Sequence, residues 1–120
     1  MGAFILFTSA LDTRIKVTLS SCFFNDRHIY NWHDLVWLNS ANLFFDAEVA
    51  QLVCPRHLYI EVGKKDELFD VKRAGIEALK VSAAYRAIKM TERFKYKEFD
   101  GTHELDKCDD GIEFLGSFLK

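Results

Sequence analysis

Apolar and polar residues follow two different spacings along this chain, which predicts a mixture of strands and helices. An apolar residue at every second position is typical of a half-buried strand, whereas apolar residues three or four positions apart are typical of a helix. The first spacing, together with β-branched and aromatic residues, predicts strands at Arg14–Ser20, His57–Val62 and Phe94–Phe99. The second predicts helices at Ala3–Leu11, Phe45–Val53 and Val71–Met90, and a last one that begins at Asp109 or Asp110.

Two of these helices have a definite expected apolar face. Asp70 is expected to cap the longest helix, because its carboxylate can accept hydrogen bonds from the first free backbone N–H groups. The apolar stripe of that helix is expected to comprise Val71, Ala74, Ala78, Leu79 and Tyr85. The stripe of the last helix is expected to comprise Ile112, Leu115, Phe118 and Leu119.

The order of the elements predicts the fold class. Helices that alternate with strands indicate an α/β fold, in which right-handed crossovers join parallel strands. We therefore expect one domain over residues 1–120, interrupted by an irregular, aromatic-rich excursion at about residues 21–45. Three strands form a very small sheet for helices on both faces, so the domain is expected to be incomplete.

Composition excludes several classes of function. The chain has 120 residues, with 16 Lys and Arg against 18 Asp and Glu, and this balance does not favour binding to nucleic acid. No apolar run is long enough to span a bilayer, so no membrane segment is expected. Cys22, Cys54 and Cys108 form no disulfide framework and favour a reducing compartment. The apolar N-terminus lacks the basic residues of a signal peptide, which fits a cytoplasmic protein if Met1 is the true start; otherwise the localisation is open.

Two loops carry the residues best suited to chemistry. In open parallel sheets, functional residues collect in the loops after the carboxyl ends of the strands. Asp66 follows the second predicted strand, and His103 follows the third. A carboxylate that holds a histidine in one tautomer is half of a relay that activates a nucleophile, so we expect this pair to meet at one edge of the sheet.

The same loops resemble those of a known family. Cys54–Asp66 is similar to the segment that leads to the catalytic acid of α/β-hydrolases, best in their dienelactone hydrolase and acetyl xylan esterase-like branch. Phe99–Glu104 resembles the loop that carries the catalytic histidine, and Met1-Gly2-Ala3 resembles the end of the G-x-S-x-G nucleophile elbow. The resemblance covers essentially the whole chain but only the C-terminal half of the family's domain, with three parallel strands and flanking helices.

The resemblance implies a role for each matching residue. Asp66 would orient His103, and His103 would act first as general base and then as general acid on an ester. The backbone N–H of Met1 would correspond to an oxyanion donor, and the nucleophilic serine would lie directly before Met1, outside the chain. Glu67 is a weaker candidate for the acid. The family resemblance implies neither a cofactor nor a metal ion.

Alternatives within the chain are less specific. Ser9, Ser20 and Ser21 lack the strained turn that exposes a nucleophile. Cys22, His28, His33, Cys54 and His57 have some spacings that suit metal ligands, but none has a paired CxxC form. Asp106, Asp109 and Asp110 do not complete a calcium loop, because Cys108 and Ser117 stand where oxygen ligands are needed. The aromatic residues of the excursion fit a substrate pocket and simple packing equally well.

Two functions remain open. The first is the C-terminal part of a serine esterase that is expected to be inactive alone. The second is an interaction module, in which the free edge of the first strand pairs with a second copy or with a separately encoded N-terminal half.

Overall fold

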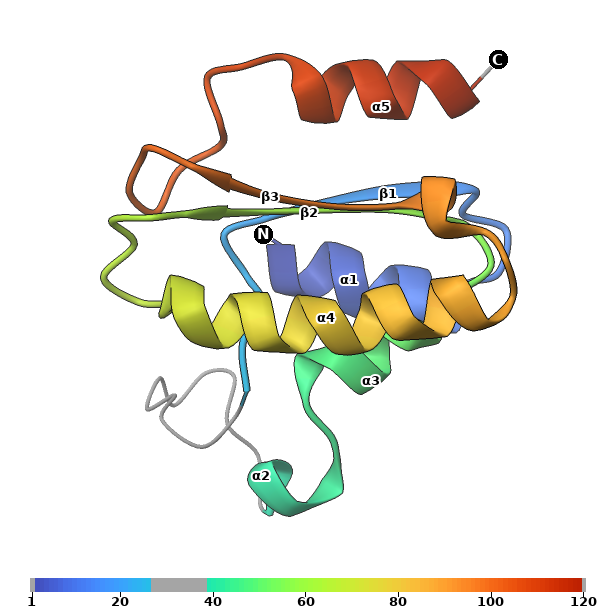
Figure 1. The fold of residues 1–120 in the computed structure, drawn as a ribbon, viewed down its shortest axis with the longest axis horizontal. Coiled ribbons are helices and arrows are strands. Elements are labelled where there is room, and N and C mark those ends of the chain that lie inside the picture. The colour runs from blue at the N-terminus through green and yellow to red at the C-terminus, as the bar shows by residue number, and fades with distance from the viewer. Residues whose placement is uncertain (1, 27–38, 120) are drawn as a thin grey trace.

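The computed structural model describes residues 2–26 and 39–119, which form a three-stranded sheet between two layers of helices (Figure 1). The strands lie in the order β1-β2-β3, and both neighbouring pairs are parallel. In register, Leu19 of β1 lies opposite Tyr59 of β2, and Ile60 of β2 lies opposite Tyr96 of β3. The strand bounds are Val17–Ser21 for β1, His57–Gly63 for β2 and Phe94–Phe99 for β3. The predicted α/β fold class with three parallel strands is confirmed.

The helices are divided unequally between the two faces of the sheet. Among the helices of the described residues, Figure 1 shows α1, α3 and α4 on one side and α5 on the other. Their bounds are Gly2–Leu11 for α1, Asp46–Gln51 for α3, Val71–Ala87 for α4 and Asp110–Phe118 for α5. A short helix α2 (Ser40–Leu43) lies within the predicted excursion, and a 3-10 turn η2 (Thr91–Arg93) precedes β3. No helix in the described part of the chain combines the length and apolar character that crossing a membrane requires.

The main core lies between the sheet and the helices α1, α3 and α4. Leu58, Ile60 and Val62 of β2 are fully buried there, and Tyr85 of α4 is buried with them. The buried stripe of α4 follows steps of four, three and four residues, from Ala74 through Ala78 and Val81 to Tyr85.

One expectation about the face of α4 is wrong. Leu79 is 69% exposed, because the position next to Ala78 is turned about 100° away from the buried stripe. The helix also ends at Ala87 rather than at Met90. The predicted cap is confirmed, since a carboxylate oxygen of Asp70 accepts hydrogen bonds from the N–H groups of Lys72 and Arg73.

Helix α5 covers the opposite face through aromatic contacts. The ring of Phe118 stacks on that of His57 with a centroid distance of 3.6 Å, and Phe114 lies against Tyr59 at 5.3 Å. The predicted stripe is therefore only partly right. Ile112 is 51% and Leu119 67% exposed, because the two phenylalanines, rather than these residues, meet the aromatic surface of β2.

The contact between His57 and α5 predicts a pH-dependent stability. Burial, assisted by the positive charge of Arg93, lowers the pKa of His57 below its ordinary value of 6.5. The unfolded chain therefore binds a proton more readily than the folded chain, so stability is full above about pH 6.5 and falls as the pH drops through the lowered pKa. Urea unfolding at pH 7.5 and 5.5 checks this prediction.

A His57→Phe variant is the matched control, because it keeps a ring against Phe118 and removes the titration. We expect the variant to lose less stability than the native chain between the two pH values. Equal losses in both chains would show that His57 does not contribute to the pH dependence.

Candidate active site

The loops after β2 and β3 are joined by the backbone before any side chain is considered. The N–H of Lys64 donates to the carbonyl of Phe99, and that of Lys65 donates to the carbonyl of Gly101, both at 2.9 Å. Gly63, the last residue of β2, permits this close approach, since a Cβ there would lie 2.6 Å from the carbonyl oxygen of Gly101. The two loops that the sequence analysis singled out are therefore held together at the carboxyl end of the sheet.

The side chain of Asp66 is completely buried and held from two sides. Its Oδ1 accepts hydrogen bonds from the backbone N–H groups of Leu68 at 2.8 Å and Phe69 at 3.2 Å. Its Oδ2 lies 2.9 Å from Nδ1 of His103. This arrangement fixes the carboxylate and directs its second oxygen at the imidazole.

The imidazole of His103 is positioned by Asp66 and by an aromatic neighbour. Its ring stacks on Phe69 with a centroid distance of 5.7 Å and an interplanar angle of 18°. An ionised carboxylate only accepts hydrogen bonds, so a hydrogen bond in this contact requires the proton of His103 on Nδ1. In the neutral ring, Nε2 then keeps its lone pair, and the side chain is 44% exposed, so a substrate or nucleophile could reach it.

The other predicted members of the site have different outcomes. Glu67 is exposed and makes no hydrogen bond to His103, so Asp66 is the acid that the structure brings to the histidine. Met1, the candidate oxyanion donor, lies outside the described residues. His28 and His33, whose spacing suits metal ligands, also lie outside the described residues.

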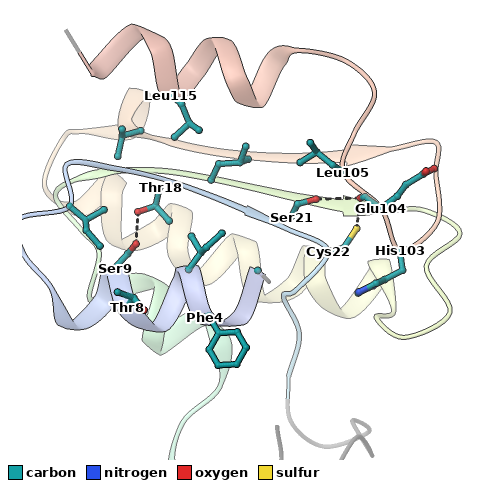
Figure 2. A pocket seen from close by; sticks show the side chains of 15 residues that line it. Phe4, Thr8, Ser9, Thr18, Ser21, Cys22, His103, Glu104, Leu105 and Leu115 are labelled. Carbon is teal, nitrogen blue, oxygen red and sulfur yellow. Dashed lines mark hydrogen bonds between the residues drawn. The ribbon is translucent and has the colours of Figure 1, made fainter. Parts of the chain in front are cut away.

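A hollow of about 700 Å³ lies beside His103 along the free edge of β1 (Figure 2). Its walls come from α1, β1, α5 and the loop after β3, and include Gly2, Thr18, Leu19 and Cys22. Thr18 of β1 contacts α1 through Ser9 on one face of the sheet, and Leu19 lies against Gly111 of α5 on the other face. The helices therefore cover the two faces of β1, and the hollow lies along its edge.

No serine of the described residues is hydrogen-bonded to His103. The hydroxyl of Ser9 accepts a hydrogen bond from Thr18 at 2.9 Å. The Ser20 hydroxyl donates to the carbonyl of Gly2, and the Ser21 hydroxyl donates to the carbonyl of Glu104. These serines serve local structure, in agreement with the absence of an elbow motif around them.

Cys22 is the site residue that sequence reasoning did not place here. It follows β1 directly, at the edge where Asp66 and His103 meet. Its place just after a predicted strand is the feature of the sequence that could have identified it. Its backbone adopts a left-handed conformation with φ of 50°, and its thiol donates to the carbonyl of Glu104 at 2.9 Å. Burial raises the pKa of the Cys22 thiol, so in this state it is a poor nucleophile.

Two acidic residues around the start of α5 form ion pairs with one lysine. Nζ of Lys97 lies 2.6 Å from a carboxylate oxygen of Asp106 and 2.6 Å from one of Asp110. Its ammonium lowers the pKa of Asp106. These contacts tie α5 to β3.

No protein-family model and no curated protein matches the chain, but solved structures resemble it. A carbohydrate esterase family 15 glucuronoyl esterase from Caldicellulosiruptor kristjansonii superposes with a TM-score of 0.76 at 14% identity, over 94% of this chain and 39% of that one. Methylesterase BT1017 gives 0.69 at 14% identity, over 98% of this chain and 26% of that one. A glucuronoyl esterase from Solibacter usitatus gives 0.69 at 14% identity, over 95% and 38%.

These likenesses show the fold. The chain has a partial α/β-hydrolase fold that corresponds to part of the esterase structures. It spans well under half the length of each of the three.

Proposed function

We propose that this chain supplies the acid and the histidine of a serine esterase that cleaves carboxylic esters, and that the nucleophile belongs to a segment preceding Met1. One observation carries the proposal. The buried carboxylate of Asp66 holds Nδ1 of a half-exposed His103 at 2.9 Å, at the carboxyl end of a parallel sheet. That end is where open α/β sheets carry their active sites.

The proposed chemistry assigns one proton to His103 at each step. Nε2 of His103 takes the proton of the serine hydroxyl as its oxygen attacks the ester carbonyl, and Asp66 stabilises the imidazolium that forms. His103 then gives that proton to the leaving alcohol, which leaves an acyl-enzyme. A water molecule, deprotonated by the same nitrogen, hydrolyses the acyl group and restores the serine.

The start of α1 supports the proposed place of the nucleophile. Gly2 packs so closely on the end of β1 that a Cβ there would lie 2.8 Å from Cβ of Phe23, and Gly2 lines the same hollow as His103. We therefore propose that the segment before Met1 continues into this hollow, toward His103. In this proposal Met1 follows the nucleophile, and its backbone N–H donates to the oxyanion.

The substrate class rests on two lines of support. The loop motifs favour the dienelactone hydrolase and acetyl xylan esterase-like branch, and the solved structures that resemble the chain are named as esterases. Both point to a small-molecule carboxylic ester.

A second function, an interaction module, is favoured by the contrast between the two sheet edges. Strand β3 carries Lys95 and Lys97, which discourage pairing with another strand, whereas β1 reads Val-Thr-Leu-Ser-Ser and has no charge. This edge would pair with a second copy or with an N-terminal half. Gel filtration tests it, since a compact monomer that binds no further strand would contradict it.

The reading frame upstream of the Met1 codon provides the test of the esterase proposal. We expect codons for Gly-X-Ser directly before Met1, and hydrolysis of p-nitrophenyl acetate by the extended polypeptide. His103→Ala should lower that rate by about 10³-fold or more, because the base and the acid are lost together. An extended polypeptide that is inactive, or indifferent to His103→Ala, would refute the proposal.

A further inference from the structure

We propose that Cys22, Asp66 and His103 together bind a zinc-like divalent metal ion. The sulfur of Cys22, a carboxylate oxygen of Asp66 and a ring nitrogen of His103 all lie within 4.8 Å of one another. The three donors come from separate loops, after β1, β2 and β3, which the parallel sheet brings to one edge. Figure 2 shows the sulfur of Cys22 beside the loop that carries His103 and Glu104.

The donor set favours a particular class of ion. A thiolate with an imidazole and one carboxylate suits Zn²⁺ or Co²⁺, whereas Mg²⁺ and Ca²⁺ prefer oxygen ligands alone. Donors around a tetrahedral zinc ion lie roughly 3.5 Å apart, so a small rearrangement of donors that already lie within 4.8 Å of one another would complete the site. The partly exposed side chain of His103 is the donor best able to make that movement.

The surroundings give an ion access to the three donors. They also keep a fourth ligand position open. Cys22 and His103 both line the hollow beside β1, so a water molecule could occupy the fourth position from that side. On binding, the thiol of Cys22 releases its proton to solvent and gives up its hydrogen bond to the carbonyl of Glu104.

A metal ion at this place would regulate the proposed esterase. A ring held by the ion, with Asp66 also engaged, could not accept the proton of a nucleophile. This consequence rests on the proposed function, whereas the binding itself depends only on the three donors.

Titration of the whole chain with Co²⁺, after removal of any affinity tag, tests the binding directly. We expect one ion per chain, with the visible bands of a tetrahedral ion and a near-ultraviolet thiolate-to-cobalt band. Zn²⁺ should displace the Co²⁺, and Mg²⁺ should not. Cys22→Ser should remove the thiolate band and weaken binding at least tenfold, and His103→Ala should weaken it by a similar factor.

Cys108→Ser is the matched control, because it removes an exposed cysteine outside the cluster and should leave the titration unchanged. Circular dichroism checks that each variant is folded, and Cys22→Ala serves if Cys22→Ser is not. Absence of the thiolate band in the native chain, or undiminished binding by a folded Cys22 variant, would overturn the metal site. Because the readout is optical, failure of the esterase proposal would leave the expected result unchanged.

Discussion

Asp66→Asn is expected to lower kcat for ester hydrolysis about 10⁴-fold in the polypeptide that carries the nucleophile. The carboxylate requires a proton on Nδ1 of His103, whereas an asparagine amide can donate to Nδ1 and so favour a proton on Nε2. A ring with that tautomer cannot accept the proton of a serine. Steady-state hydrolysis of p-nitrophenyl acetate measures the effect.

Two neighbouring acids provide matched controls for this variant. Asp100 is exposed and paired with Lys65 at 2.7 Å, and Glu67 is exposed beside Asp66. Asp100→Asn and Glu67→Gln each remove one negative charge near the site, and both should stay within about threefold of the native rate. A loss on Glu67→Gln that matches that on Asp66→Asn would reassign the acid.

Gly63→Ala is expected to destabilise the chain by about 2–3 kcal/mol and to displace the loop that carries His103. The added methyl group would meet backbone atoms of Gly101 and Thr102, and backbone cannot move aside as a flexible side chain can. Urea unfolding measures the loss of stability. The amide and imidazole resonances of His103 report the displacement of its loop.

Gly116→Ala is the control for the Gly63 variant, since a Cβ at Gly116 of α5 would meet nothing within 4 Å. It should leave stability unchanged or raise it by up to about 1 kcal/mol, the gain in helix propensity. If Gly63→Ala is as stable as the native chain and leaves the His103 resonances in place, Gly63 is not needed to join the two loops.

Parts of the fold that depend on local pattern were predictable from the sequence. The three strands, the four main helices and the Asp70 cap follow from periodicity and from residues that end elements. The meeting of Asp66 and His103 also followed, because parallel strands place their carboxyl ends at one edge. Their catalytic role is a prediction that the experiments above test.

Other features depend on contacts between distant residues and were not predictable in this way. The spacing of α5 placed Phe118 on the inner face but could not reveal that Phe114, rather than Ile112, joins it against β2, because His57 and Tyr59 select that face. From the sequence alone, Leu79 fits an apolar stripe as well as Val81 does. Contact with the sheet fixes the rotation of α4, which buries Val81 and exposes Leu79. Cys22 entered the site only because the end of β1 lies beside the loop of His103.

The tautomer of His103 tests the central claim most directly, because it reports whether Asp66 holds the ring as a base. Long-range nitrogen–hydrogen correlation spectra of the labelled chain at neutral or mildly alkaline pH distinguish the two neutral forms. We predict a protonated Nδ1 and a free Nε2 in the native chain, with the protonated nitrogen changed in Asp66→Asn. A native ring that carries its proton on Nε2, or one unaffected by Asp66→Asn, would contradict the account.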